Sequence, residues 1–540
     1  MRLLIKKAVF SDFYSRALLS LLIFHLVFNL LWIFLDTSPL PWDQAGHTRL
    51  AFHFANFIKD LGFLRIVDYF SISSYYPPLV HTIASIPILI FGNPVDIGQI
   101  TITVFFLFSI ALVYILTLDL FARRDIAIVS AFIYSFLPSV FELSRWFLLE
   151  IPLLTFVLAG IICLLRSDGF SNRKYALGFF VFAAFAFLTK WLAFFYLIFP
   201  ASLVFYSFLK NTPELKLVAK ESILKGLSIF LLLLLPWYLI NINSLIPDIL
   251  TNVQGERVDP GLLSLQNIIF YLYLFINFQL TLFVFILFLI SLVFFAIKNF
   301  PNKILIIGYI VFIYVVFTLI SNKDLRYILP IAPFTVMIMS AFLIKLKDRF
   351  RNLGRLILAC LAAYLISYYF LLSFRFPINL SYQKAIEFPV IGWVDYVNIK
   401  DVLAHAYDRT SWPQKEILSD IESLEPEENG FETIWVISVS DQERFNNTNL
   451  VLEKEIGGFD SLRIEPPPQK PSMSQEEIKA YLYRFKYALV AKENVVSPAT
   501  RNAGVLLDFK TEIEANYYKK IKDYPLPNSD IMTLYQLKPQ

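Results

Sequence analysis

Long apolar runs separated by short polar segments dominate the first 375 residues of this 540-residue chain. A helix that crosses a bilayer needs about 20 mostly apolar residues, with about 17 as the lower limit. The segments that approach or exceed this length are 17–35, 98–121, 126–143, 148–165, 175–189, 191–209, 226–243, 279–297, 303–320, 327–345 and 355–374. The pattern therefore predicts a polytopic α-helical membrane protein with about 11 transmembrane helices.

A further apolar run at 79–91 is too short to cross comfortably and contains Pro87. Cytoplasmic loops are enriched in Lys and Arg, so the charge distribution tests whether this run crosses. If it stays on one side, the Lys- and Arg-rich segments all fall inside: 1–16, 122–125, 166–174, 210–225, 298–302 and 346–354. If it crossed, that bias would reverse. We therefore expect a juxtamembrane helix at 79–91 within an outer loop 36–97, and a cytoplasmic N-terminus in the plasma membrane.

Residues 376–540 have a different composition, rich in charge and proline. The runs 433–439, 487–491 and 531–537 alternate or are continuously apolar, which is typical of strands. Ser474 is followed three residues later by Glu477, the signature of a helix N-terminal capping box. The chain therefore divides into a transmembrane module, 1–375, and an extracytoplasmic α/β domain, 376–540.

Composition supports the membrane class and gives no indication of nucleic-acid binding, a disulfide or a cysteine metal site. Hydrophobic residues make up 57% of the chain and charged residues 17%, against about 45–50% and about 25% in soluble proteins. A net charge of +4, unevenly placed, gives no indication of nucleic-acid binding. Cys163 and Cys360 both lie in apolar runs, which indicates small buried side chains rather than a disulfide or metal site.

Ionisable residues gather near the predicted outer ends of the spans. They are Asp36, Asp43, His47, His81, Glu142, Arg145, Glu150, Lys190, Arg257, Asp259, Lys323, Asp324 and Arg326. Arg and Lys are suited to holding a phosphate, and a carboxylate can take the proton of an attacking hydroxyl. With apolar helices to hold a lipid tail, this set favours group transfer from a lipid-linked phosphate donor.

Four motifs then carry a family resemblance over residues 1–375. They are Pro41-Trp42-Asp43, Tyr76-Pro77-Pro78-Leu79, Arg145 followed by Glu150-Ile151-Pro152-Leu153, and Arg326-Tyr327 with Pro330 and Pro333. In this order and placement the chain resembles the GT-C membrane glycosyltransferases that use polyprenyl-phosphate sugars. Within that superfamily it is similar to the protein O-mannosyltransferases and the lipid A aminoarabinose transferases.

The resemblance implies an inverting transferase whose active site lies on the non-cytoplasmic side. The family's first-loop catalytic aspartate corresponds to Asp43, and a second acidic residue, more often Asp in the family, corresponds to Glu150. Gln44 stands where the family commonly has Glu, and Tyr76 where it commonly has His or Lys. These departures leave the sugar and the use of a metal open.

The predicted site therefore contains catalytic, phosphate-binding and lining residues. The catalytic candidates are Asp43 and Glu150, the donor-phosphate ligands Arg326, Lys190 and Arg145, and the lining residues Gln44, His47, Tyr76, His81 and Tyr327. No cofactor is required; a divalent metal would have only His47 and His81, 34 positions apart, as an indication. The expected partners are a polyprenyl-phosphate-linked sugar, a glycan, lipid or protein acceptor, and membrane lipids, with no nucleic acid.

Other interpretations remain open for the site and for the chain. Asp43 is compatible with a cap on a helix beginning near Ala45, and Glu150 with a structural brace to Arg145. The chain as a whole is compatible with a transporter of lipid-linked sugars or with a non-catalytic relative. A transporter needs a polar path across the bilayer, whereas the middle of these spans is nearly all apolar.

Overall fold

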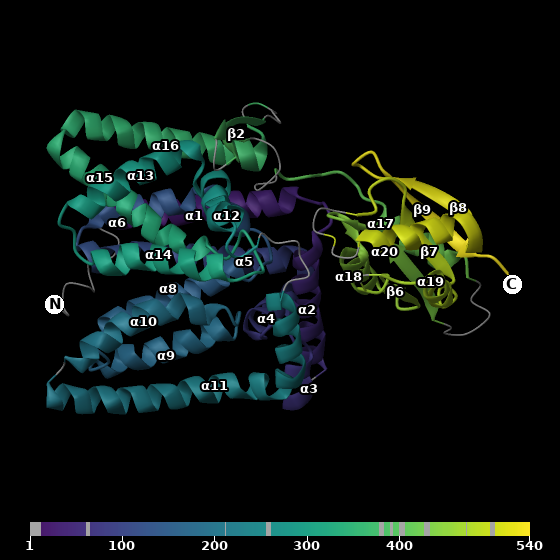
Figure 1. Ribbon diagram of the computed structural model, residues 1–540, viewed down its shortest axis with the longest axis horizontal. Helices are drawn as coiled ribbons and strands as arrows, with labels where there is room; N and C mark the ends of the chain where they lie inside the picture. Colours follow the sequence, from purple (N-terminus) through teal and green to yellow (C-terminus); the bar gives the residue numbers. More distant parts are fainter. Residues whose placement is uncertain are drawn as a thin grey trace. The chain divides into compact units, whose positions relative to one another are not determined.

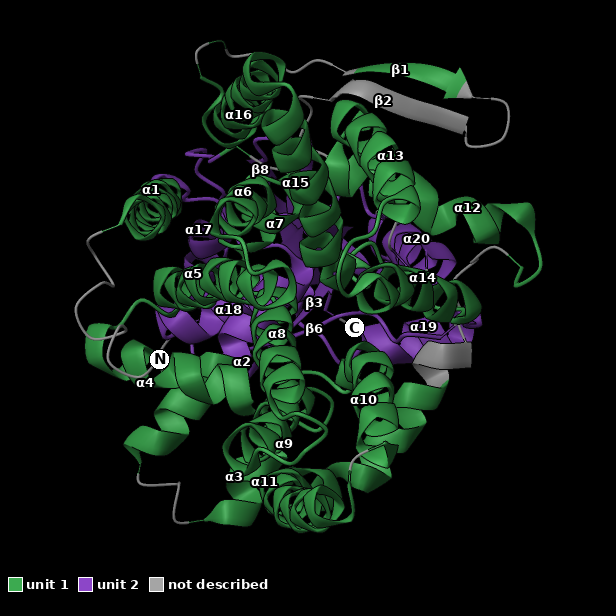
Figure 2. Cartoon of the chain, turned by 90° about the vertical axis from the view of Figure 1, so that its left-hand side faces the viewer, with its two compact units in different colours: residues 1–34, 51–406 green, residues 35–50, 407–540 purple. Residues whose placement is uncertain are grey.

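The computed structural model describes residues 12–60, 65–210, 212–254, 261–376, 378, 383–388, 392–398, 406–425, 433–470, 472–496, 500 and 503–539. The chain separates into two compact units, coloured in Figure 2. The helical unit comprises Met1–Phe34 and Ala51–Ala406, and the C-terminal unit comprises Leu35–Leu50 and Tyr407–Gln540.

The helical unit is built from long apolar helices that run side by side (Figure 1). Its elements are α1 (Phe13–Leu35), α3 (Ile66–Ser71), α4 (Leu79–Phe91), α5 (Pro94–Phe121), α6 (Arg124–Ser135), α7 (Pro138–Leu143), α8 (Glu150–Arg166), α9 (Arg173–Phe187), α10 (Ala193–Leu209), α11 (Pro213–Gln254), α12 (Leu265–Leu274), the π-helix η2 (Phe275–Leu280), α13 (Leu282–Ile297), α14 (Lys303–Leu319), the 3₁₀ turn η3 (Leu329–Ile331), α15 (Ala332–Arg349), α16 (Arg351–Phe374), and the hairpin β1 (Gln383–Phe388) and β2 (Gly392–Asn398). Helix α2 (Trp42–Lys59) begins in the C-terminal unit and ends in the helical unit.

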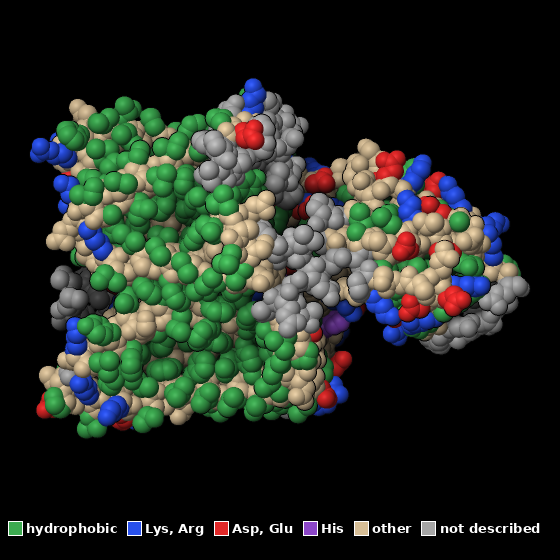
Figure 3. Space-filling view, viewed as in Figure 1, with side chains coloured by type: hydrophobic (Ala, Val, Ile, Leu, Met, Phe, Trp, Pro, Cys, Tyr) green, Lys and Arg blue, Asp and Glu red, His purple; other side chains and the backbone are tan. Residues whose placement is uncertain are grey.

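Membrane-spanning character is clear for several of these helices. Among the described residues, five helices are long and apolar enough to cross a bilayer, or six if α12–η2 and α13, bent by 112°, form one span. In the most apolar stretch of the η3–α15 span, 83% of the residues are buried, so this span is central. In the corresponding stretch of the α11 span only 11% of the residues are buried, so most of its side chains face outward. Figure 3 shows hydrophobic side chains covering the visible face of the helical unit. The chain is therefore a multi-pass membrane protein.

The Lys- and Arg-rich turns meet at one end of the helical unit, on the left in Figure 1. Arg123 pairs with Asp348 at 2.7 Å, and Lys347 pairs with Asp125 at 3.3 Å. The Asn302 side chain donates to the Leu120 carbonyl at 2.9 Å. Segments expected on one side of the membrane thus lie together, while their assignment to the cytoplasm stays a prediction.

Each of the eleven apolar segments expected to span contains a helix, and residues 79–91 form α4 as predicted. Two segments are interrupted for local reasons. Segment 126–143 divides into α6 and α7 because Pro138 begins a new helix. Segment 279–297 is broken at Thr281, whose φ of 70° cannot continue a right-handed helix.

The C-terminal unit is an α/β domain, as predicted. Its described elements are α17 (Gln414–Ser423), β3 (Ile434–Val439), β4 (Asp441–Gln442), β5 (Phe445–Asn446), α18 (Asn447–Gly457), β6 (Leu462–Glu465), α19 (Gln475–Leu482), β7 (Tyr487–Ala491), α20 (Ala503–Glu512), the π-helix η5 (Ile513–Tyr517), β8 (Tyr518–Pro525) and β9 (Ile531–Leu537). The predicted strands correspond to β3, β7 and β9, and Ser474 caps α19 in a full capping box with Glu477.

One five-stranded sheet organises that unit, with strand order β6-β3-β7-β9-β8. Strand β3 runs parallel to β6 and β7, whereas β9 runs antiparallel to β7 and β8. Every residue of the central strand β7 is buried. Strands buried on both faces read as continuous apolar runs, which explains why Tyr487–Ala491 was recognisable from sequence.

Gly354 tests the close packing of the α15–α16 turn. A Cβ added there would lie 2.3 Å from Cα and 2.5 Å from N of Lys347, both backbone atoms. We expect Gly354→Ala to lower the thermal unfolding midpoint of the purified protein. The matched control is Gly160→Ala in α8, whose Cβ would meet Leu197 at an ordinary 3.5 Å and should gain about 0.5–1 kcal/mol. Equal midpoints for the two variants would contradict the close approach.

Candidate functional site

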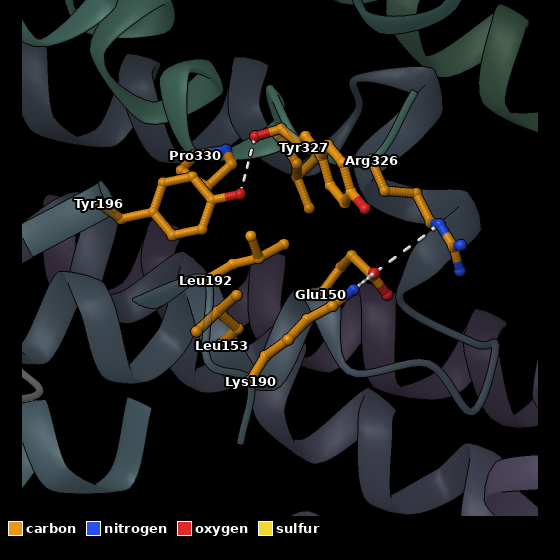
Figure 4. A pocket seen from close by; sticks show the side chains of 9 residues that line it. Glu150, Leu153, Lys190, Leu192, Tyr196, Arg326, Tyr327 and Pro330 are labelled. Atoms are coloured by element: carbon orange, nitrogen blue, oxygen red, sulfur yellow. Dashed lines mark hydrogen bonds and ion pairs between the residues drawn. The ribbon is translucent and has the colours of Figure 1, made fainter. Parts of the chain in front are cut away.

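A small pocket opens between the first turn of α8, the turn from α9 to α10, and the segment from α14 to η3 (Figure 4). Its empty volume is about 230 Å³. The lining residues are Glu150, Leu153, Lys190, Leu192, Tyr196, Arg326, Tyr327, Leu329 and Pro330. The pocket thus combines a charged end with an apolar one, and all of its residues belong to the helical unit.

The charged end is organised around the carboxylate of Glu150, whose side chain is only 5% exposed. Lys190 Nζ donates to Glu150 Oε1 at 2.8 Å. Arg326 Nε lies 3.7 Å from the same oxygen (Figure 4). A carboxylate in an apolar environment is costly unless it is paired, so these two cations account for its burial.

A second carboxylate, Asp324, holds Arg326 in place. Both Nε and Nη2 of Arg326 donate to it, with the shortest contact 2.6 Å, and the backbone N–H of Arg326 donates to Oδ1 at 2.8 Å. Burial opposes ionisation of Asp324, but the guanidinium of Arg326 outweighs it and lowers the pKa of Asp324 to about 2. Asp324 therefore stays ionised, and Arg326 stays oriented, throughout the physiological pH range.

The segment that presents Arg326 is fixed at the end of α14. Lys323 Nζ donates to the carbonyls of Phe317, Thr318 and Ile320 at 2.9, 2.8 and 2.6 Å. A lysine at this position satisfies the carbonyl groups that a helix leaves unpaired at its C-terminus. Tyr196 donates its hydroxyl to the Tyr327 carbonyl at 2.9 Å. The pocket wall is therefore held by side-chain hydrogen bonds to backbone carbonyls as well as by packing.

Two groups at the charged end of the pocket can form further hydrogen bonds, the Lys190 ammonium as a donor and the Glu150 carboxylate as an acceptor. Lys190 carries three N–H donors, and Glu150 is its single hydrogen-bond acceptor among the residues that the structure describes. Glu150 Oε2 is buried and has no hydrogen-bond partner within the described part of the chain. Buried polar atoms without partners are uncommon in folded proteins and call for an explanation.

The structure brings together four of the predicted site residues: Glu150, Lys190, Arg326 and Tyr327. Lys190 Nζ also lies 5.8 Å from the centroid of the Tyr327 ring. Asp324 and Tyr196 were not among the predicted site residues. Asp324 had a signal in its spacing two residues before Arg326, whereas nothing in the sequence distinguished Tyr196 from other tyrosines of the spans.

Arg145, the third predicted phosphate ligand, does not line this pocket. Its side chain is fully buried and pairs with Glu142 at 2.7 Å, with the guanidinium 4.4 Å from the Trp32 ring centroid. The alternative of a brace between Glu150 and Arg145 was wrong, because Glu150 pairs with Lys190 and Arg326. Arg145 therefore pairs with Glu142, three positions before it, and not with Glu150, five positions after it. Side chains three positions apart are neighbours on a helical turn.

Tyr76 and His81 also belong to the helical unit but do not line this pocket. His81 is buried on α4, where its ring is stacked on that of Phe54, with centroids 6.3 Å apart, and is tilted against that of Phe147, with centroids 6.1 Å apart. Tyr76 is partly buried, and its carbonyl accepts a hydrogen bond from Ser73 at 2.8 Å. Both residues contribute to packing at the start of α4.

Asp43, Gln44 and His47 lie on the first turns of α2 and belong to the C-terminal unit. The helix begins at Trp42 rather than near Ala45, so Asp43 is inside its first turn and does not precede it as a cap. Its side chain is exposed, while Gln44 and His47 are buried. An acidic residue in the first turn interacts favourably with the helix dipole.

No group of three or more His, Cys, Asp or Glu side chains suited to a metal ion occurs among the described residues. Arg257 and Asp259, two of the ionisable residues near predicted outer ends, lie outside the described residues.

The long apolar helices define a multi-pass membrane protein, and its fold is similar to that of two solved structures of ArnT. ArnT from Cupriavidus metallidurans bound to undecaprenyl phosphate matches with a TM-score of 0.57 at 10% identity, covering 97% of this chain and 99% of that one. The apo state of the same ArnT matches with a TM-score of 0.56 at 12% identity and the same coverage. Residues 76–246 match the family model of dolichyl-phosphate-mannose-protein mannosyltransferases. A comparison with curated protein sequences gave no match.

A double-mutant cycle tests the Glu150–Lys190 pair. Lys190→Met leaves a buried carboxylate with one cation 3.7 Å away, and breaking a buried pair costs about 3–5 kcal/mol. We expect Lys190→Met/Glu150→Leu to recover most of that loss in the free energy of unfolding, measured by denaturant titration in detergent. The exposed pair Arg166–Asp119, at 2.7 Å, is the control, with an expected coupling of about 0–1 kcal/mol. Additive losses at Glu150 and Lys190 would contradict the coupling.

Proposed function

We propose that this chain is a membrane glycosyltransferase that moves a sugar from a polyprenyl-phosphate carrier to a hydroxyl acceptor on the non-cytoplasmic face. The observation that carries the proposal is the pocket in which Lys190 and Arg326 converge beside Leu153, Leu192 and Leu329. A lipid-linked sugar phosphate has the same division into an anionic head and an apolar tail. The GT-C fold supports this choice of donor, since the ArnT of similar fold is bound to undecaprenyl phosphate.

The cations would act mainly on the leaving group. As the bond between the sugar C1 and the phosphate oxygen breaks, the electron pair stays on the phosphate, which gains negative charge. Lys190 can donate two further hydrogen bonds, and Arg326 is held in one orientation by Asp324. Preorganised donors that face developing charge stabilise the transition state more than the ground state. A phosphate whose negative charge is balanced by these two cations is then a good leaving group without an acid catalyst.

Asp43 would act as the general base. The acceptor oxygen attacks C1 from the face opposite the phosphate, its proton passes to the Asp43 carboxylate, and the configuration at C1 inverts. The family resemblance motivates this role, and the exposed position of Asp43 in the first turn of α2 is compatible with it. The C-terminal unit carries this residue.

Glu150 would orient the reactants rather than take the proton. Its Oε1 is occupied by Lys190, whereas its buried Oε2 has no partner among the described residues. A hydroxyl of the sugar or of the acceptor would satisfy that oxygen. The same carboxylate would keep the Lys190 ammonium and the Arg326 guanidinium at a fixed separation, which is the positioning that phosphate binding needs.

The direct test is transfer by the purified full chain. The protein would be incubated with a panel of polyprenyl-phosphate sugars and with glycan, lipid and peptide acceptors, and release of polyprenyl phosphate would be measured. In the wild type we expect release with at least one donor. In Asp43→Asn we expect kcat to fall about 10²–10⁴-fold, the range of general-base catalysis, with the affinity for undecaprenyl phosphate unchanged.

The matched control is Asp68→Asn, an exposed carboxylate of the same expected outer loop that pairs with Arg65 at 3.5 Å. That variant should keep wild-type activity. Full activity of Asp43→Asn would overturn the assignment of the base. Absence of release with every donor by the folded wild type would overturn the proposed function.

A further inference from the structure

The segment that carries Asp43 is part of the C-terminal unit. Residues Leu35–Leu50 group with Tyr407–Gln540, although more than 350 residues of the helical unit separate the two in sequence. The expected division at residue 375 assigned this segment to the transmembrane module. The contacts that hold it are therefore informative about what the C-terminal unit does.

The stretch before α2 is fixed by backbone and side-chain hydrogen bonds to two residues. The Thr37 N–H donates to the Asp408 carbonyl at 2.8 Å, and the Asp408 N–H donates to Asp36 Oδ1 at 2.9 Å. The Arg444 guanidinium donates to the Ser38 hydroxyl and, at 3.0 Å, to the Pro39 carbonyl. Burial raises the pKa of Asp36, and Arg444 opposes that rise.

The first two turns of α2 are fixed in the same way on both sides of Asp43. Trp42 donates its indole N–H to Asp441 Oδ1 at 2.9 Å, and Thr500 donates to the other oxygen of Asp441 at 2.7 Å. Arg49 Nε pairs with Glu455 Oε1 at 2.8 Å. Asp43 thus lies directly after one anchored residue and less than two turns before another, on a helix that rises about 1.5 Å per residue.

We propose that Asp441 and Glu455, through Trp42 and Arg49, are positioning residues for Asp43. This inference rests on the proposed function of Asp43 as general base. A base acts only within hydrogen-bond reach of its proton, and displacements of about 1 Å cost about 10²-fold in rate. An exposed carboxylate on an unsupported helix end would not meet that requirement.

Charge reversal with rescue tests the proposal in the full chain. Arg49→Glu and Glu455→Arg should each lower kcat at least tenfold, leave the KM for the donor within twofold, and speed amide exchange at residues 43–49. The double variant should return kcat to within threefold of wild type. Trp42→Phe, which keeps the ring and removes the indole donor, should lower kcat in the same way.

The control is Lys486→Glu, which breaks a pair of similar exposure in the same unit, Lys486–Glu425 at 2.7 Å, and should keep wild-type kcat. Faster exchange at residues 43–49 with unchanged kcat would overturn the positioning role while leaving the proposed function intact. An equal loss of kcat in Lys486→Glu would also overturn it. A wild type that releases no carrier phosphate would overturn the proposed function and this role together.

Discussion

A carboxylate buried among apolar helices must be paired with cations, and the pocket of this protein depends on that constraint. Glu150 is held by Lys190 at 2.8 Å, with Arg326 3.7 Å away, and Asp324 in turn orients Arg326. Each group is fixed by another because an unpaired charge in this environment would cost several kcal/mol. The arrangement leaves donors on Lys190 beside an apolar wall, which is a suitable environment for the head of an amphiphilic anion.

Two parts of the chain supply the proposed chemistry. The helical unit carries the cations, and the C-terminal unit carries Asp43 on the first turn of α2. The domain would hold the base through Asp441 and Glu455 while the helices hold the donor.

Most of the fold could be predicted from sequence because apolar length and periodicity report it directly. All eleven expected spans contain helices, and β7, β9 and the cap at Ser474 lie where their patterns predicted. The break at Thr281 escaped prediction, since an apolar run gives no indication of a residue with positive φ. The hairpin β1–β2 escaped because it follows no clear alternation of polar and apolar residues.

The site was only partly predictable. Glu150, Lys190, Arg326 and Tyr327 share a pocket, as expected of residues at matching ends of neighbouring helices. Arg145 does not line the pocket and pairs with Glu142 instead. The attachment of Trp42 to Asp441 joins residues 399 positions apart. A contact of that kind depends on the packed domain and leaves no local pattern.

The most direct measurement is a structure of the full chain with undecaprenyl phosphate bound. We expect phosphate oxygens within about 3 Å, hydrogen-bonding distance, of Lys190 Nζ and the Arg326 guanidinium, with the lipid chain leaving past Leu153 and Leu192. A phosphate bound elsewhere, with the Lys190–Glu150–Arg326 cluster unchanged and not in contact with it, would contradict the account.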